Sequence, residues 1–210
     1  MRETKTLNKL FRVIFAFSAI LLINLFSSNA AADSMPVSTK GVVVVEASGL
    51  MDPVMFEMMM ETLEKVDPSE TIALVFQVNV SGSVIGTEEI IELGQVITSS
   101  KIPISFWVGP SGARAKGPIA ELALLSGDVG ISPGSKIGKI GSNIFSSSSN
   151  AEKTVLDLSE KTFNYKEAVD SGIARSSPVL LEHLVGLEGF EVISDIETGE
   201  TKPLTQTRFE

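Results

Sequence analysis

Short, continuously apolar runs alternate with longer amphipathic segments from residue 41 onwards. Each apolar run is rich in β-branched residues or aromatics and bounded by glycine or polar residues, as buried strands are. Four runs predict strands: 41–47, 71–78, 102–108 and 128–131. Two amphipathic segments predict the helices between the first three: 53–66 and 87–99. This order predicts parallel strands joined by crossover helices, and therefore an α/β fold.

Local signals refine the ends of these elements. Asp52 followed by Pro53 is a typical helix start, an N-cap with proline at the first position. Asn164 and Glu167 have the spacing of a capping box, and Gly172 ends the short helix that they open. Other expected elements are a methionine-lined core face on the first helix (Met55, Met58, Met59, Leu63), an exposed loop at 142–150, a helix at 178–187 and a hairpin over 190–203.

The N-terminus has the pattern of a signal peptide. Four basic residues precede a 14-residue apolar run, 13–26, and Ala30 and Ala32 supply the small residues of a cleavage site. A run of this length is short for a membrane span, so an uncleaved anchor is the second interpretation. The expected organisation is a signal peptide or anchor at 1–32, a linker at 33–40, one domain at 41–195 and a C-terminal extension at 196–210.

Composition excludes several classes of function for the part after the leader. That part holds 13 basic against 25 acidic residues, a charge of −12, which repels phosphate backbones and disfavours nucleic acid as a partner. The chain has no cysteine and one histidine, which exclude disulfides and the usual zinc sites. We expect no metal and no cofactor.

Two isolated features have plain structural interpretations. The segment 134–138 has one residue too few between its glycines for a P-loop, so a tight turn is expected there. His183, without a second histidine nearby, is expected to be a surface residue or a hydrogen-bonded structural one.

Two glycine-containing segments follow neighbouring strands, 79–83 and 109–112. Turns at the carboxyl ends of adjacent parallel strands converge on one crevice, where ligands usually bind. Gly82 lets the backbone approach a ligand closely, and a helix start near Arg114 would direct free N–H groups to the same place. The residues alone leave open whether this is a binding crevice or two tight turns.

Four segments in this order resemble the protease domain of NfeD-like membrane proteins, which belong with the ClpP-class serine proteases: VVVVEASGLMDPVMFEMMMETLEKV, LVFQVNVSGS, PISFWVGPSGARAKG and GISPGSKIG. The later segments FNYKEAVDSGIA and VLLEHLVGLEGFEV are also similar. The resemblance covers about residues 41–195. It implies a crotonase-like fold, a spiral of β-β-α units around a mainly parallel sheet.

The resemblance also implies where a catalytic site would lie. Relatives place two glycines after the second strand, and the amides of these glycines form the oxyanion hole; here Gly82 and Ser83 hold those positions. The peptidase nucleophile is a serine at the position of Gly117, which Pro118 follows. Glycine cannot attack a carbonyl, and proline removes a backbone donor. The resemblance therefore predicts a degenerate site.

The remaining candidates for catalysis are weak. Ser111 is the serine at the turn, six residues before the family position. The family pairs its serine with a lysine from a later segment, which is much shorter here, and the nearest lysines are Lys136, Lys139 and Lys153. A lysine acts as a base only when burial holds it neutral, and a surface position is expected for each.

Three functions follow as hypotheses. The first is an exported, membrane-associated domain with a ClpP-class protease fold that binds or scaffolds without cleaving. The second is an active membrane-associated serine endopeptidase with a displaced Ser/Lys pair, and the third is an exported solute- or peptide-binding domain. The expected partners are proteins or peptides, membrane proteins among them, and the resemblance implies homo-oligomers. Relatives continue into transmembrane helices, so the leader or a later segment would provide the membrane attachment.

Overall fold

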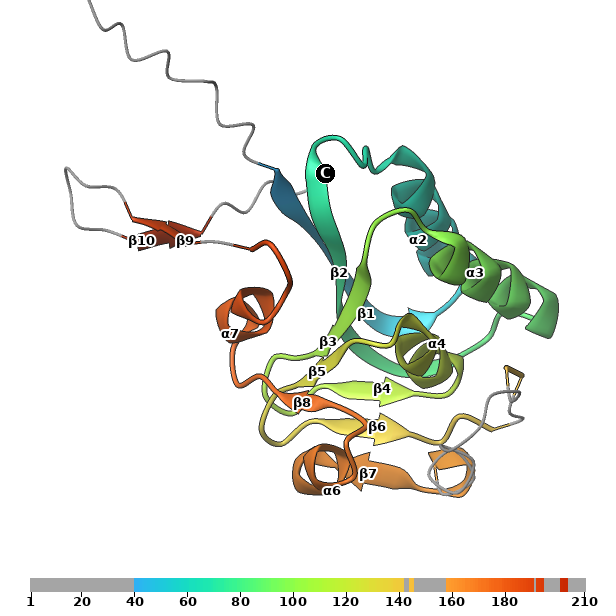
Figure 1. Cartoon of the computed structure of the whole chain (residues 1–210). Helices are drawn as coiled ribbons and strands as arrows, with labels where there is room; N and C mark the ends of the chain where they lie inside the picture. The colour runs from blue at the N-terminus through green and yellow to red at the C-terminus, as the bar shows by residue number, and fades with distance from the viewer. Residues whose placement is uncertain (1–39, 142–143, 146–157, 191, 195–200, 204–210) are drawn as a thin grey trace, which may run out of the picture. The chain divides into compact units, whose positions relative to one another are not determined.

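The computed structural model describes residues 40–141, 144–145, 158–190, 192–194 and 201–203 (Figure 1). All of them belong to the second of two units into which the chain divides, Thr39–Glu210. The expected signal peptide and linker, Lys153 and most of the loop at 142–150 lie outside the described residues. Within the described part, no helix has the length and apolarity needed to cross a membrane.

Strands and helices alternate through the described part. In chain order they are β1 (Gly41–Met51), α2 (Pro53–Lys65), β2 (Thr71–Ser83), α3 (Thr87–Ser99), β3 (Ile104–Val108), β4 (Arg114–Lys116), α4 (Pro118–Ser126), β5 (Val129–Ile131), β6 (Lys136–Gly138), β7 (Thr162–Asn164), α6 (Tyr165–Asp170), β8 (Arg175–Ser176), α7 (Leu180–Val185), β9 (Val192–Ser194) and β10 (Thr201–Pro203).

One mainly parallel sheet organises the fold (Figure 1). Its strands follow the order β7-β6-β4-β2-β3-β5-β8, with β1 paired to β2, and only β6 and β7 are antiparallel. The long strand β2 pairs with β3 through residues 74–78 and then with β4 at Val80. The strands β3 and β4 are followed by the helix α4, and the next two strands, β5 and β6, pair in parallel with β3 and β4 respectively. The chain thus forms the expected β-β-α units around a parallel sheet.

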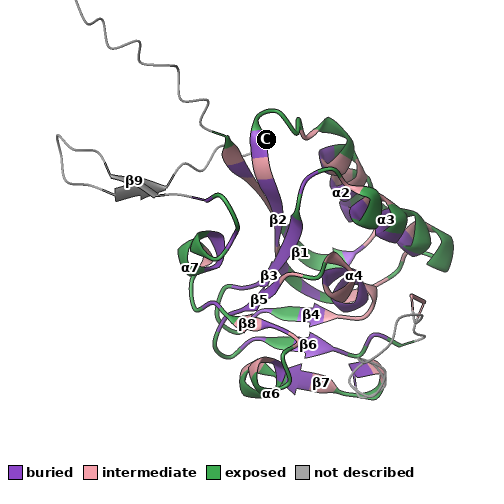
Figure 2. Ribbon diagram, in the orientation of Figure 1, coloured by how far each residue is buried: buried purple, intermediate pink, exposed green. Residues whose placement is uncertain are grey.

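The two faces of the sheet have separate cores. Figure 2 shows buried residues along the strands of the sheet. Side chains alternate along a strand, so Leu74 and Phe76 of β2 face one core while Ala73 and Val75 face the other. The first core includes α2, α3 and α4, and the predicted methionine face is confirmed: Met55 and Met59 are buried, while Met58 and Leu63 are half-buried against it. The second core holds Trp107, Leu184, Leu187 and Phe190.

The predicted helix starts are confirmed. Asp52 Oδ1 accepts a hydrogen bond of 2.9 Å from the Met55 amide, with Pro53 at the first helical position. Asn164 and Glu167 exchange the two bonds of a capping box at the start of α6, at 3.1 and 2.8 Å. The expected hairpin is present as the antiparallel pair β9–β10, and its turn lies outside the described residues.

Three sequence expectations are wrong in detail. β1 was expected to be a buried strand, but it pairs only with β2, and Val43, Val44 and Val45 are half-buried. Strand β2 does not end at residue 78 but continues through Ser83. Arg114 begins a strand instead of a helix, because β4 pairs on one side with β2 and on the other with β6.

Candidate functional site

A bulge at the end of β2 shapes the first part of the candidate site. Gly49 pairs with Val80 and Met51 with Ser83, so two residues of β2, one of them Gly82, lie opposite a single residue of β1. Such bulges change the direction of a strand and are frequent next to active sites. A Cβ at Gly82 would contact Leu50 Cδ1 at 3.5 Å. The segment 79–83 is therefore a bulged strand end and not the turn that the sequence suggested.

Gly117 forms the second part of the site, between β4 and α4. It is the N-cap of α4, with φ 77° and ψ −147°, and Pro118 follows at the first helical position. This backbone conformation is strained for any residue with a Cβ. The Gly117 amide donates to the Gly138 carbonyl at 3.2 Å, which holds the helix start against the end of β6.

The structure brings these two parts together. A Cβ placed on Gly117 would have the Gly82 Cα as its nearest neighbour, at 4.0 Å, and both glycines are half-buried. A side chain at position 117 would thus project over the backbone at Gly82. This arrangement fits the family expectation of a nucleophile position beside an oxyanion strand, with glycine in place of the nucleophile.

Ser83 lies beside this point, but its hydroxyl is engaged elsewhere. Its Oγ donates to the Met51 carbonyl and accepts from the Ile85 amide, both at 3.3 Å. The side chain therefore closes the end of the bulge against β1. Only the backbone of Ser83 remains as a candidate for contacting a ligand.

Ser111 lies at the other end of β4 from Gly117. Its hydroxyl donates to the Pro133 carbonyl at 2.6 Å, so the turn at 109–112 packs on the turn before β6. The residues of β4 separate Ser111 from Gly117 by a distance on the order of 10 Å, given the rise of a strand. The two glycine-containing segments do meet at one end, where the Gly109 amide donates to the Val78 carbonyl at 3.3 Å and the Arg114 amide donates to Asn79 Oδ1 at 3.2 Å. Gly82, however, faces Gly117 and not Ser111.

The two candidate lysines that the structure describes are exposed. Lys136 lies on β6 opposite Arg114, at the same end of β4 as Ser111. Lys139 follows β6 with φ 54°, and its amide donates to the Lys161 carbonyl at 3.0 Å. Neither side chain has the burial that makes a lysine a general base.

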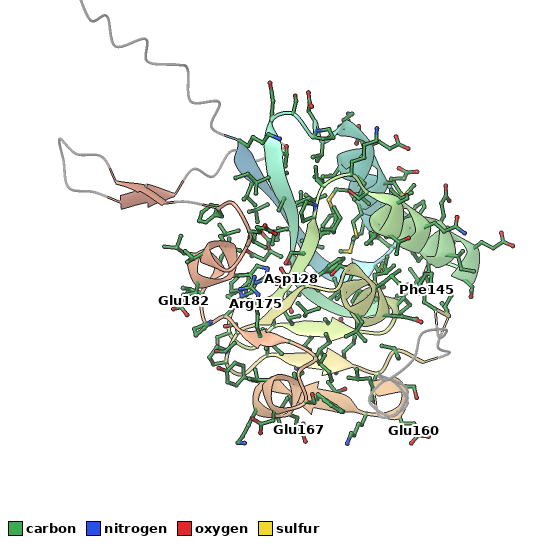
Figure 3. All side chains as sticks on the ribbon, viewed as in Figure 1. Asp128, Phe145, Glu160, Glu167, Arg175 and Glu182 are labelled. Carbon is green, nitrogen blue, oxygen red and sulfur yellow. The ribbon has the colours of Figure 1, made fainter. Side chains whose placement is uncertain are left out.

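A second polar cluster, which the sequence did not predict, joins β3, β5, β8 and α7. Ser105 Oγ donates to Asp128 Oδ2 at 2.6 Å and lies 2.7 Å from His183 Nε2. Arg175 Nε donates to Asp128 Oδ1 at 3.0 Å, and Arg175 also donates to the His183 carbonyl at 2.8 Å. Figure 3 shows Asp128 and Arg175 side by side beneath α7. His183 is fully buried and lies within hydrogen-bond distance of Ser105, so the second of its two expected roles, a hydrogen-bonded structural residue, is confirmed.

This cluster has the residue types of a catalytic triad but not its geometry. In a triad the histidine lies between serine and carboxylate, whereas here the serine lies between the other two. Ser105 is also buried, with 1% of its surface exposed, so no substrate reaches its hydroxyl. Because that hydroxyl gives its one hydrogen to Asp128, His183 donates from Nε2, and its role is to attach α7 to the sheet.

Burial dominates the electrostatics of the cluster. Burial is the largest cause that lowers the pKa of His183, the positive charge of Arg175 adds to it and Asp128 opposes both, and the resulting pKa is about 4. Burial alone would raise the pKa of Asp128, but the hydrogen bonds from Arg175 and Ser105 outweigh it, and the net pKa is lowered. His183 is therefore neutral at physiological pH. Its Nδ1 and the Ser177 hydroxyl are buried without a partner among the described residues.

Two further features bear on ligands. Among the described residues, no group of three or more histidine, aspartate or glutamate side chains is arranged to hold a metal ion. A cavity of about 310 Å³ lies between the C-terminal ends of α2 and α3, lined by Leu63, Val66, Ser99 and Ile102 among others. This cavity shares no residue with the pair Gly82 and Gly117. We take that pair as the candidate functional site, because the resemblance implies the oxyanion hole and the nucleophile at these positions.

The comparisons with known proteins agree with this geometry at the level of the fold. No model of a known family matches the chain, and no curated protein matches its sequence. Solved structures do match. The 1510-N membrane protease specific for a stomatin homolog from Pyrococcus horikoshii is 20% identical, with a TM-score of 0.59 over 82% of this chain and 90% of that one. A mutant of 1510-N in complex with a substrate peptide is 17% identical, with a TM-score of 0.58 over 80% and 89%.

Crotonase-type enzymes are similar as well. An enoyl-CoA hydratase/isomerase family protein from Silicibacter pomeroyi is 12% identical, with a TM-score of 0.53 over 66% of this chain and 72% of that one. The chain thus has the ClpP/crotonase-like fold. The structures bear out the resemblance to NfeD-like protease domains at the level of the fold, and the expected fold class is confirmed.

Proposed function

We propose that this chain is an exported, membrane-associated binding domain that retains the fold of a ClpP-class serine protease and does not cleave peptides. The observation that carries the proposal is Gly117, which has no side chain and lies beside Gly82, at the position where the resemblance implies the nucleophile. The only serine of the preceding turn lies at the other end of β4, with its hydroxyl bonded to Pro133. Acylation chemistry has no nucleophile at this point.

The proposed partners are proteins or peptides. The similar structures are described as a membrane-bound, stomatin-specific protease, and one of them holds a substrate peptide. A protease fold that loses its nucleophile keeps the surfaces that bind an extended chain, so peptide binding is the property it retains most readily. The signal-peptide pattern at 1–32 supports export, and homo-oligomers belong to the same proposal.

Active-site labelling tests the absence of a nucleophile. We expect a fluorophosphonate to leave the chain unmodified, because Ser111 gives its hydroxyl hydrogen to the Pro133 carbonyl and Ser105, which lies beside the buried His183, has only 1% of its surface exposed. The measurement is intact mass after labelling, followed by peptide mapping. A stoichiometric adduct on a peptide spanning 105–120 would contradict the proposal. Hydrolysis of apolar peptides that Ser111→Ala abolishes would support the alternative, an endopeptidase with a displaced nucleophile.

Restoring the nucleophile alone should not restore proteolysis. Gly117→Ser places a hydroxyl beside Gly82, but no lysine among the described residues is buried, and without such a base the hydroxyl remains a neutral alcohol and a weak nucleophile. We also expect a loss of about 2 kcal/mol of unfolding free energy, since φ 77° and ψ −147° are strained for serine while the space for a Cβ is free.

Gly117→Ala is the matched control for this variant, because it adds the same strain without the hydroxyl. Both variants should unfold at the same lower denaturant concentration, and neither should hydrolyse peptides or react with the fluorophosphonate. Robust turnover by Gly117→Ser and not by Gly117→Ala would show that a base and an oxyanion hole survive, and would overturn the proposal.

A further inference from the structure

Three cations share one face of the small strands beside the candidate site; Arg114 and Lys136 are exposed and Lys116 is half-buried. Arg114 and Lys116 alternate with buried Ala115 on β4, and Lys136 precedes buried Ile137 on β6. Since side chains alternate along a strand, all three cations lie on the face opposite the core. We call Arg114, Lys116 and Lys136 the basic strip. Lys116 directly precedes Gly117, so the strip leads to the candidate site.

The basic strip is an unfavourable arrangement for the isolated fold. Arg114 and Lys136 are paired directly across β4 and β6, and like charges at such positions repel. The next partner of Lys136, on β7, is the uncharged Asn164. In the part of the chain that the structure describes, none of the three cations forms an ion pair, whereas Lys65, Lys166 and Arg175 each have an acidic partner.

The charge of the rest of the chain makes this clustering informative. After the leader, acidic residues outnumber basic ones by 25 to 13, so three cations gathered on one face are unusual for this chain. A repulsive pair left open to solvent is compensated when a ligand of opposite charge covers it. Carboxylates are ligands of opposite charge for these side chains: arginine binds a carboxylate through bidentate hydrogen bonds, and lysine binds it as a point charge.

We propose that the basic strip binds an acidic, extended segment of a partner protein, with carboxylates at alternate positions. This inference rests on the proposed function, and it names the chemistry of the peptide. Arg114 and Lys116 are two residues apart on one strand, a spacing of about 6.6 Å, which matches every second side chain of an extended peptide. The peptide lies across the face of β4, because β4 is already paired on both edges.

The competing occupant of such a strip is an anionic membrane surface. The net charge of −12 after the leader disfavours membrane binding, because an extended anionic bilayer faces much of the acidic surface at once. A short peptide contacts only the basic strip, and salt screens it from acidic residues farther away. The strand spacing is a second argument, because a membrane surface has no requirement for charges at alternate positions. We therefore treat membrane binding as an outcome of the test.

The experiment measures peptide binding by the full chain with fluorescence anisotropy. The probes are fluorescein-labelled peptides of about eight residues: one with glutamate at every second position, one with the same composition and the glutamates in a block, and one with glutamine throughout in place of glutamate. We expect the alternating peptide to bind about tenfold more tightly than either control, and added salt to weaken it. Equal binding of the alternating and blocked peptides, or no binding, would overturn the proposal.

Charge reversal locates the site. Arg114→Glu and Lys136→Glu should each lower the affinity about tenfold, while Lys101→Glu, an exposed lysine away from the strip, should not. Arg114→Glu also replaces a repulsive pair by an attractive one, so its thermal midpoint should not fall, which separates lost binding from misfolding.

The last arm of the experiment uses vesicles with and without anionic lipid. If the chain binds anionic vesicles but no peptide, and the same variants abolish this binding, the strip binds a membrane instead. Fluorophosphonate labelling of the same preparation tests the proposed function separately.

Discussion

Replacing Gly138 by alanine should lower the free energy of unfolding by on the order of 4 kcal/mol, because the substitution combines a strained backbone with a close contact to a backbone oxygen. Gly138 ends β6 with φ 135°, a region that residues with a Cβ avoid. The added Cβ would lie 2.4 Å from the Lys161 carbonyl oxygen and 3.1 Å from Leu158, which is fully buried. The first of these contacts is with backbone, which cannot rotate away as a side chain can.

Gly127→Ala is the control for Gly138→Ala. Gly127 caps α4 with φ 80° and ψ −8°, and a Cβ there would meet nothing within 4 Å. It should cost about 1 kcal/mol, the effect of the left-handed backbone alone. Denaturant unfolding of the two variants beside the parent checks the pair. If both lose the same amount, the close approach of β6 to residue 161 does not hold in solution.

Gly138 also shows how far the sequence could predict the candidate site. The segment 134–138 was expected to be a tight turn; the chain turns at 133–134, but residues 136–138 form the strand β6. What no local pattern indicated is that Gly138 accepts a hydrogen bond from the Gly117 amide, which fixes the start of α4. That contact depends on the pairing of β4 with β6, and hence on residues that are distant along the chain.

The long elements were predictable because their own sequence determines them. α2 and α3 have helical periodicity with clear start signals, and the apolar runs of β2 and β3 can only be buried strands. β4 was missed because Arg-Ala-Lys has no strand preference of its own. Three residues form a strand here since β2 and β6 supply partners on both sides, which is a tertiary effect.

The resemblance located the candidate site better than the reasoning from turns did. It paired Gly82 with Gly117, and the structure places a Cβ at position 117 within 4.0 Å of Gly82. The reasoning from strand ends paired the segment 79–83 with the turn at 109–112 instead. That reasoning holds for Asn79, whose side chain accepts a hydrogen bond from the Arg114 amide, but not for Gly82. The chain passes from the turn at 109–112 into β4, and Gly117, after the far end of β4, is the residue that faces Gly82.

The cluster around His183 could not be predicted, because its members come from four separate elements. Ser105 and His183 are 78 residues apart, and the sequence around neither of them indicates the other. A lone histidine in a short helix has no pattern that separates a surface position from a buried one. Only the pairing of β5 with β3 and β8, and the packing of α7 in the second core, bring Ser105, Asp128, Arg175 and His183 together.

Acidification should destabilise this chain well above the pH at which carboxylates titrate, and His183 is the reason. Its pKa is about 4 in the folded chain against 6.5 when exposed, because burial disfavours the charged ring and Arg175 repels it. A depressed folded pKa means that the stabilisation is complete above pH 6.5 and is lost as the pH falls toward 4. The loss over this window is about 3 kcal/mol, and about 2 kcal/mol of it should have occurred by pH 5. Asp128, whose pKa is lowered, adds its own loss only at more acidic pH.

Urea unfolding at a series of pH values between 7 and 5, for the parent and for His183→Gln, measures this contribution. Glutamine keeps an N–H that can donate to Ser105 but cannot be protonated, so the variant should be less stable at pH 7 and show a much flatter pH dependence. The comparison is needed because Glu121 acts in the opposite direction: burial raises its pKa, so its contribution is present at low pH and lost as the pH rises. That effect is common to both proteins and cancels in the difference between their slopes. If the two proteins have parallel pH profiles, the protonation of His183 does not change on unfolding. The contact of His183 with Ser105 then opens in the folded chain without loss of stability.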